Sequence, residues 1–283
     1  RGTEIVAIGT SSSNLQTVNN LMASGGPQAV VNALGPNTAG VSRVLRINNG
    51  GTVSEVTVAK TEFALDPVSN RYGAKVLNDG GKLVGYINLR TFIDTADADL
   101  RAAFANFKSQ GVTEVIVDVR YNGGGLVRIA ELFGDLLSAN RVGQVFSRTT
   151  FRDSKAANNT TKTFAAQTQA IAATKIAFIG YSGTASASEL VANAFIPYLG
   201  TNTALIGGNT FGKPVGQIAF DRAECDDRMR VTAFQTENRD GQGNYYTGLA
   251  SNLVMFDVGF GLAALLPARP RDLRNLTLWT QPS

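Results

Sequence analysis

The chain of 283 residues contains no histidine, and this absence excludes a large part of enzyme chemistry. Without histidine there is no Ser-His-Asp triad, no Cys-His pair and no metal site with a histidine ligand. Cys225 is the single cysteine, which also excludes an internal disulfide and a multi-thiolate zinc site. We interpret Cys225 as a half-buried apolar side chain. A hydrolase built from this sequence needs another base, and lysine is the usual substitute because burial can lower a lysine pKa toward neutrality.

Long apolar runs and a large excess of one charge are missing too. No run approaches the roughly 18 to 20 apolar residues that cross a bilayer, and the opening RGTEIVAIGT does not resemble a signal peptide. The 26 basic and 22 acidic residues leave a net charge of +4, and the basic residues are scattered rather than clustered. We therefore expect no nucleic-acid partner and no membrane-spanning segment in this chain, and any export signal is expected to lie outside it.

The pattern along the chain predicts two parts and a tail. Residues 1–77 alternate short apolar runs with Gly, Asn and Ser clusters, which predicts a small β-rich module, truncated because its first strand has no earlier strand to pair with. Residues 78–250 alternate strands and helices, which predicts an α/β core with a largely parallel sheet. Residues 251–283 show no clear period. The predicted strands of the core are 83–89, 112–119, 142–146, 175–180, 203–207 and 229–236, its helices are 94–111, 126–140 and 187–199, and 148–163 is a predicted polar loop.

The stretch GTASASEL, residues 183–190, follows a predicted strand and opens a predicted helix. Ser186 and Glu189 have the spacing of a capping box, and Thr184 could also cap the helix. A serine at a helix start also lies beside unpaired N–H groups and the positive end of the helix dipole, which favour a developing oxyanion. A structural cap and an attacking nucleophile are therefore compatible interpretations of Ser186.

Two further stretches follow strands, where ligands gather in open α/β sheets. NGGG, residues 122–125, allows the backbone to approach a ligand closely, although a plain turn is the alternative and the spacing of nucleotide-binding loops is absent. In TFGKPVGQ, residues 210–217, Lys213 lies between Gly212 and Pro214 and near Phe211. An ammonium group would be poorly solvated in such surroundings, as a lysine base requires, although an ordinary loop lysine is the alternative.

Taken together, VIVDVRYNGGG, TASASEL and GNTFGKPVGQ resemble, in this order, the three motifs of the S41 family of carboxy-terminal processing, or tail-specific, serine proteases. The family pattern is D-L-R-x-N-x-G-G, then T-A-S-A-S-E, then T-F-G-K. The resemblance implies a ClpP/crotonase-like protease core for residues 78–250 and no cofactor or metal. It also implies a serine endopeptidase that cuts protein substrates near their C-terminus through an acyl-enzyme.

The resemblance assigns roles residue by residue. It implies that Ser186 is the nucleophile, that Lys213 is the general base, and that Gln217 helps to orient the lysine. The oxyanion donors that it implies are the backbone N–H of Ala187 and one from the glycine loop, Gly124 with Gly125 as the alternative.

The start of the chain carries a weaker resemblance. RGTEIVAIG resembles a stretch inside the PDZ domain that precedes the protease core, with Thr3 where aspartate is usual. The carboxylate-binding loop of a PDZ domain would come earlier, so no peptide-tail site is assigned to residues 1–77. Two further departures are Pro214, which stands where glycine commonly follows the lysine, and a missing acidic residue in the helix after the nucleophile.

The expected partners are protein or peptide substrates with apolar C-terminal tails. By resemblance alone, we expect a periplasmic or cell-envelope location in a bacterium. The main alternative is a catalytically silent module on the same fold that binds a peptide or an apolar ligand. A thioester hydratase of the crotonase type is a further alternative, but no loop offers a convincing pair of carboxylates. The proximity of Ser186 to Lys213 in the folded chain separates the protease from the silent module.

Overall fold

The computed structural model describes residues 3–69 and 72–249, which divide into two compact units. The first unit ends at Ala64 and the second begins at Leu65. The boundary expected after residue 77 is therefore too late, because β5 (Ala74–Asp79) pairs with β6 (Lys82–Asn88) of the second unit. The expected tail, 251–283, lies outside the described residues.

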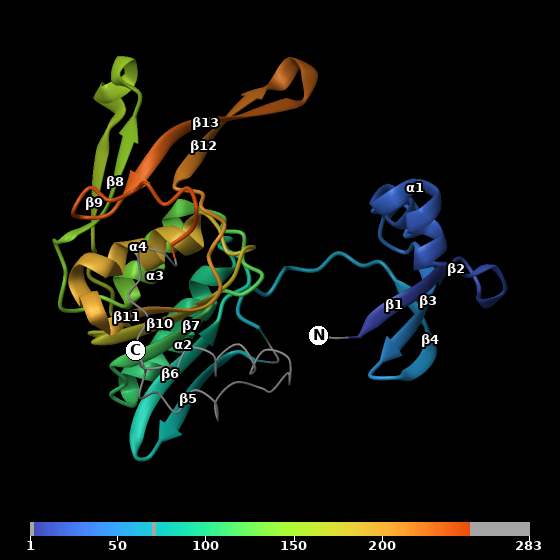
Figure 1. Cartoon of the computed structure of the whole chain (residues 1–283), viewed down its shortest axis with the longest axis horizontal. Helices are drawn as coiled ribbons and strands as arrows, with labels where there is room; N and C mark the ends of the chain where they lie inside the picture. Colours follow the sequence, from blue (N-terminus) through green and yellow to red (C-terminus); the bar gives the residue numbers. More distant parts are fainter. Residues whose placement is uncertain (1–2, 70–71, 250–283) are drawn as a thin grey trace, which may run out of the picture. The chain divides into compact units, whose positions relative to one another are not determined.

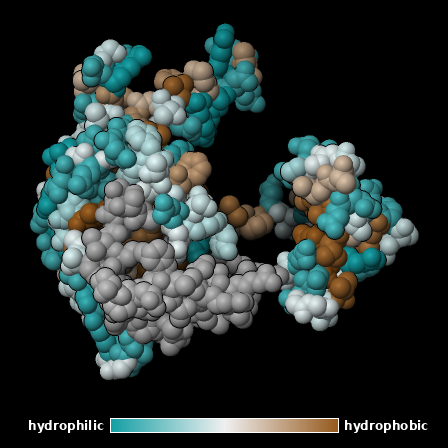
Figure 2. Space-filling model, viewed as in Figure 1, coloured by the Kyte–Doolittle hydropathy of each residue, from teal (hydrophilic) through white to brown (hydrophobic). Residues whose placement is uncertain are grey.

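The first unit is a four-stranded antiparallel sheet of order β2-β1-β3-β4 with one helix. Its elements are β1 (Glu4–Gly9), η1 (Ser12–Asn14), β2 (Gln16–Thr17), α1 (Val18–Ala33), β3 (Ser42–Asn49) and β4 (Thr52–Ala59). The expectation of a β-rich module omitted α1, because Leu21 is its one fully buried residue and the helix has little apolar periodicity. Apolar residues gather on part of the visible surface of this unit (Figure 2). The PDZ resemblance stays a prediction.

The second unit is built on a five-stranded sheet of order β11-β10-β7-β6-β5 (Figure 1). Its other strands are β7 (Glu114–Asp118), β10 (Lys175–Gly180) and β11 (Thr203–Gly207). Four strands run parallel and β5 pairs antiparallel with β6. The α/β fold and the largely parallel sheet are therefore as expected, and parallel strands bring their carboxyl ends to one edge.

Three helices pack on one face of this sheet: α2 (Ala96–Ser109), α3 (Val127–Leu136) and α4 (Ala187–Leu199). They form one core with alternate residues of the strands, such as Val117 and Phe178, and each fully buried large apolar side chain contributes about 1.5 to 3 kcal/mol. The fully buried rings of this core are Phe92, Phe104, Phe107, Phe133, Phe146, Phe164, Phe178 and Phe195.

An antiparallel sheet of order β12-β13-β8-β9 extends from the core as two projecting hairpins (Figure 1). It consists of β8 (Val145–Phe151), β9 (Thr160–Thr163), β12 (Val215–Arg222) and β13 (Asp227–Glu237), with η2 (Asp153–Asn158) between β8 and β9. The expected loop at 148–163 is thus wrong, and β12 was not expected. The cause is the same in both: strands exposed to solvent lack an apolar run or a clear alternation.

Cys225 lies in η4 (Ala223–Cys225) between β12 and β13 and is exposed, so its interpretation as a half-buried side chain is wrong. Within residues 3–69 and 72–249, no helix combines the length and the apolar character needed to cross a membrane.

Candidate active site

The three sequence motifs follow three neighbouring parallel strands of the central sheet. NGGG follows β7, GTASASEL follows β10, and TFGKPVGQ follows β11 after Gly207. Because neighbouring parallel strands point the same way, all three loops emerge at the same edge. Sites were expected at these junctions, and the sheet topology places the three loops side by side.

Ser186 has an unusual backbone conformation directly before α4. Its φ of 57° and ψ of −115° place it at the left-handed side of the Ramachandran map, where residues other than glycine are rare. Such a conformation costs roughly 1 to 3 kcal/mol and persists only where the surrounding structure holds it. The next N–H, that of Ala187, opens the helix and has no acceptor within the described part of the chain. Ala187 therefore stands where an oxyanion donor is expected.

Glu189 holds the serine and the lysine loops together. It is fully buried, and its Oε2 accepts hydrogen bonds from the backbone N–H of Ser186 and from that of Lys213, both at 2.8 Å. The two backbone nitrogens therefore lie within twice that distance of each other. Its Oε1 accepts from the Thr210 hydroxyl at 2.5 Å and from the Gly212 N–H at 2.7 Å. Only a capping role was expected for Glu189, because this second role depends on a segment more than twenty residues away.

Asn122 fixes the glycine loop against the serine loop and is itself completely buried. Its side-chain amide donates to the Leu89 backbone carbonyl at 3.0 Å. Its backbone carbonyl accepts from the Ala185 N–H at 3.2 Å and from the Ser188 hydroxyl at 3.1 Å. The role of this asparagine within NGGG was not foreseen. Its position between strand β6 and the serine loop explains why the loop has a defined course.

The glycines at positions 124 and 125 are required by close backbone approach. A Cβ on Gly124, whose φ is 101°, would lie 2.8 Å from the Ser186 Cβ and 2.9 Å from the Ala187 nitrogen. A Cβ on Gly125, whose φ is 143°, would lie 2.2 Å from the Phe92 carbonyl oxygen. The Gly124 N–H donates to the Asn122 side-chain oxygen at 2.9 Å. No acceptor for the Gly125 N–H is found within the described residues.

Thr184 links the strands and does not cap α4. Its hydroxyl donates to the Val119 carbonyl at 3.0 Å and accepts from the Tyr181 N–H at 3.2 Å. Its carbonyl accepts from the Phe211 N–H at 2.8 Å. Thr184 therefore connects the loops that follow β7, β10 and β11, and the expectation that it could serve the helix end is not met.

Gln217 lies on β12, where it is exposed at a register shift next to Gly216. Its side chain makes no hydrogen bond to a described residue, Lys213 included. Pro214, the residue that departs from the family pattern, is accommodated because its carbonyl accepts from the Thr236 N–H at 2.7 Å. This bond joins the lysine loop to β13.

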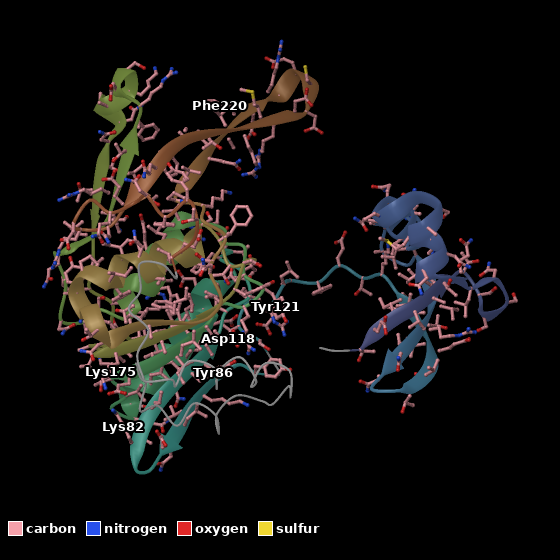
Figure 3. All side chains as sticks on the ribbon, viewed as in Figure 1. Lys82, Tyr86, Asp118, Tyr121, Lys175 and Phe220 are labelled. Atoms are coloured by element: carbon pink, nitrogen blue, oxygen red, sulfur yellow. The ribbon has the colours of Figure 1, made fainter. Side chains whose placement is uncertain are left out.

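Asp118, at the end of β7, anchors the start of the glycine loop. It is buried, accepts the Tyr86 hydroxyl at 2.8 Å, and pairs with the Arg120 guanidinium at 2.8 and 3.0 Å (Figure 3). Burial and then the negative charge of Asp118 raise the pKa of Tyr86 above its usual range. The phenol therefore stays a hydrogen-bond donor at physiological pH. In residues 3–69 and 72–249, no three metal-ligating side chains gather into a cluster.

The chain is similar in sequence to proteins of one peptidase family. The model of peptidase family S41 matches residues 83–254. The chloroplast carboxyl-terminal-processing peptidase 1 of Arabidopsis thaliana is 30% identical over 212 residues, covering 72% of this chain and 40% of that protein. The carboxyl-terminal-processing protease of Synechocystis sp. is 30% identical over 205 residues, covering 70% of this chain and 43% of that protein. The chain thus spans less than half the length of these relatives.

Solved structures share the fold. A Bacteroides fragilis protein described as an S41 protease superposes with a TM-score of 0.68 at 22% identity, covering 94% of this chain and 72% of that one. The photosystem II D1 C-terminal processing protease gives a TM-score of 0.54 at 21% identity, covering 91% of this chain and 62% of that one. The match of the family model to more than half of the sequence shows that this chain belongs to peptidase family S41.

Proposed function

We propose that this chain carries the catalytic unit of a serine endopeptidase that cuts protein substrates near their C-terminus, with Ser186 as nucleophile and Lys213 as general base. One observation carries the proposal: a single carboxylate oxygen, Oε2 of Glu189, accepts the backbone N–H groups of both residues at 2.8 Å. A fold that needed neither residue would have no reason to fix them to one atom. The strained backbone of Ser186 also supports a functional role.

The mechanism is acyl transfer. The amine of Lys213 takes the proton of the Ser186 hydroxyl while the oxygen attacks the scissile carbonyl carbon. The tetrahedral intermediate collapses as Lys213 returns the proton to the leaving amine, which leaves an ester on Ser186. Water, deprotonated in its turn by Lys213, attacks the ester, and the new C-terminus leaves as Lys213 returns that proton to the Ser186 oxygen. Atoms and protons balance without a cofactor.

The oxyanion is held by backbone N–H groups. Ala187 supplies the first, because it is the first residue of α4 and the helix dipole favours negative charge there. The glycine loop supplies the second. Gly125 is favoured as this donor because its N–H has no acceptor among the described residues. The Gly124 N–H can bind the oxyanion only if its hydrogen bond to the Asn122 side chain breaks. Loss of one such donor typically costs about 10² to 10³ in kcat.

Gln217 keeps its proposed role as the residue that orients Lys213, on the resemblance alone. In this role Gln217→Ala would lower kcat more than it raises KM, since the residue would act through the base and not through the substrate. Equal kinetics for the variant and the wild type would remove Gln217 from the catalytic unit.

The remaining proposals concern the whole protein. The first unit, which ends at Ala64, is proposed to form a PDZ-like module, the second unit is proposed to be the protease core, and 251–283 is proposed to be an extension. The substrates are proposed to end in apolar tails, and the location to be extracytoplasmic, such as a bacterial periplasm. The names of the Arabidopsis relatives place those proteins in the chloroplast. The silent binding module, the alternative function, has no observation in its favour.

The deciding experiment measures cleavage of an unstructured protein that ends in an apolar tail. Ser186→Ala is expected to abolish cleavage, and Lys213→Met to lower kcat by about 10² to 10⁴, the contribution of a general base. Ser154→Ala and Lys155→Met, both exposed in η2, are the matched controls and should cleave like the wild type. Substantial cleavage by Ser186→Ala would overturn the proposal.

A further inference from the structure

Thr210 lies between the carboxylate of Glu189 and the last residue that the structure describes. Its hydroxyl donates to Glu189 Oε1 at 2.5 Å and accepts from the Leu249 N–H at 2.9 Å. The threonine is 4% exposed, and both hydrogen bonds are buried. A threonine hydroxyl has a single hydrogen, and the bond accepted from Leu249 occupies one of its lone pairs and turns that hydrogen toward the carboxylate. The direction of the donor is therefore fixed from both sides.

The backbone of the lysine loop packs directly on the chain that precedes Leu249. A Cβ on Gly248, whose φ is 100°, would lie 2.6 Å from the Thr210 carbonyl oxygen. A Cβ on Gly212, whose φ is 88°, would lie 2.3 Å from the Tyr246 carbonyl oxygen. Each glycine thus allows an approach that a side chain would block. This close contact holds the Leu249 N–H at a defined place beside the threonine hydroxyl.

Thr210 reaches the proposed catalytic residues through Glu189. The two oxygens of the carboxylate belong to one planar group, and the terminal torsion of a glutamate is otherwise broad. A hydrogen bond at Oε1 therefore also limits where Oε2 lies, and Oε2 accepts the N–H groups of Ser186 and Lys213. The second donor to Oε1, the Gly212 N–H, belongs to the lysine loop itself. The threonine hydroxyl adds a restraint whose direction is set from outside that loop.

We propose that Thr210 is a positioning residue for the acyl-transfer reaction. Its hydroxyl, oriented by the Leu249 N–H, sets the angle of the Glu189 carboxylate and thereby the spacing of the serine and lysine loops. The inference rests on the proposed function and adds to it a residue that acts through another. A purely structural threonine is the competing interpretation, and it predicts a loss of stability with no specific effect on the reaction or on the two loops.

The first measurement is the kinetics of cleavage of the tailed protein substrate by the full chain. Thr210→Val keeps the shape of the side chain without the hydroxyl, and Thr210→Ser keeps the hydroxyl without the methyl group. We expect Thr210→Val to lower kcat by about 10- to 100-fold and to leave KM within about threefold, because misplaced reacting groups slow the chemical step and not substrate binding. Thr210→Ser should keep kcat within about threefold of the wild type, since it presents the same donor and acceptor.

Thr203→Val is the matched control for the loss of a buried hydroxyl. Thr203 is fully buried, and its hydroxyl donates to the Phe195 carbonyl at 3.4 Å. It is the first residue of β11, so it lies at the end of that strand opposite to the catalytic loops. The control variant should keep the wild-type kcat even if its melting temperature falls. A lower stability alone would then not account for a loss of kcat in Thr210→Val.

The second measurement does not depend on turnover. Native-state hydrogen exchange, followed by NMR in the full chain, reports how often the N–H groups of Ser186 and Lys213 open. In Thr210→Val both should exchange about 10- to 100-fold faster, the effect of losing one hydrogen bond to a charged group. The Val119 N–H, which donates to the Ile179 carbonyl at 3.0 Å, is the internal reference and should keep its exchange rate.

Each outcome bears on the proposal. A wild-type kcat in Thr210→Val, an equal loss in Thr203→Val, a Thr210→Ser variant as slow as Thr210→Val, or unchanged exchange at Ser186 and Lys213 would overturn the positioning role. A Thr210→Val chain that does not fold would overturn it as well, because the hydroxyl would then serve the fold. Faster exchange in a chain whose wild type cleaves no substrate would refute the proposed function and leave the positioning of the two loops intact.

Discussion

At the scale of single residues, the buried carboxylate of Glu189 is the feature on which the site depends most. It accepts four hydrogen bonds, three of them from backbone N–H groups on two loops. An ionised carboxylate has acceptor capacity for all four and no hydrogen to present to them. No neutral side chain of the same size can replace it, because an amide turns one of its two ends into a donor.

Glu189→Gln is therefore expected to be severe. The amide NH₂ would face two of the four donors, and each buried donor left without an acceptor costs about 1 to 3 kcal/mol. We expect a lower melting temperature, measured by circular dichroism, and a loss of at least about 100-fold in kcat/KM, since a small displacement of reacting groups has that effect. A variant with wild-type kcat/KM would show that Glu189 only supports the fold.

Gly124→Ala tests the close approach of the glycine loop to the nucleophile. The new Cβ would meet the Ser186 Cβ and the Ala187 nitrogen at less than 3 Å, in a conformation that L-residues avoid. We expect kcat to fall by about 10² or more because the oxyanion donors move with the loop. Gly123→Ala is the matched control, since a Cβ there meets no atom within 4 Å. The prediction is wrong if both variants keep wild-type kinetics.

At the scale of elements, α3 is joined to the segment after β9 by Asp135. This buried carboxylate accepts from the Ala165 N–H at 2.8 Å and from the Gln167 amide at 3.2 Å. Burial raises the pKa of Asp135, and these hydrogen bonds together with Lys162 and Arg101 offset only part of the rise. The charged form of the side chain is therefore less favourable in the folded than in the unfolded chain.

The sign of the pH effect follows from this direction. As pH rises above the ordinary aspartate value of 3.8, the unfolded chain loses this proton first, so the contribution of Asp135 to stability falls with rising pH. The unfolding free energy of Asp135→Asn, taken relative to that of the wild type, should thus increase as the pH rises from about 4 to about 7, as measured by urea titration. Asp153→Asn, an exposed site, controls for net charge. A relative loss for Asp135→Asn with rising pH would contradict the argument.

At the scale of the whole molecule, the two units are joined by a segment in which residues 61–65 are exposed. Phe63 is 74% exposed. Lys60, by contrast, is fixed to the first unit by hydrogen bonds from its ammonium group to the Gly35 and Pro36 carbonyls, both at 2.8 Å. The connecting segment is therefore exposed at Phe63, whereas Lys60, three residues earlier, is held by hydrogen bonds.

This contrast predicts the course of limited proteolysis. Among the sites between residues 3 and 249, chymotrypsin is expected to cut first after Phe63, and trypsin to cut after Lys60 more slowly, because proteases need a locally open backbone. Mass spectrometry of the early fragments gives the answer. First chymotryptic cuts inside the five-stranded sheet would show that the second unit opens more easily than the connection.

The residue types and their local spacing limit the chemistry that is possible. The missing histidine excluded the common triads, and three short motifs after predicted strands named Ser186 and Lys213 as candidates. Buried strands and amphipathic helices were also predictable, because an apolar run or a 3.6-residue period is visible within a short stretch of sequence. The solvent-exposed strands β9 and β12 were not predictable, because their residues carry neither signal.

The way in which the candidate residues meet depends on contacts that form only in the folded chain. The shared carboxylate of Glu189 and the Asn122 bridge depend on contacts between loops that follow different strands. The order of the strands, β11-β10-β7, is what brings these loops to one edge, although β7 and β10 are far apart in the sequence. The order is set by the packing of the whole core, and no local pattern contains it.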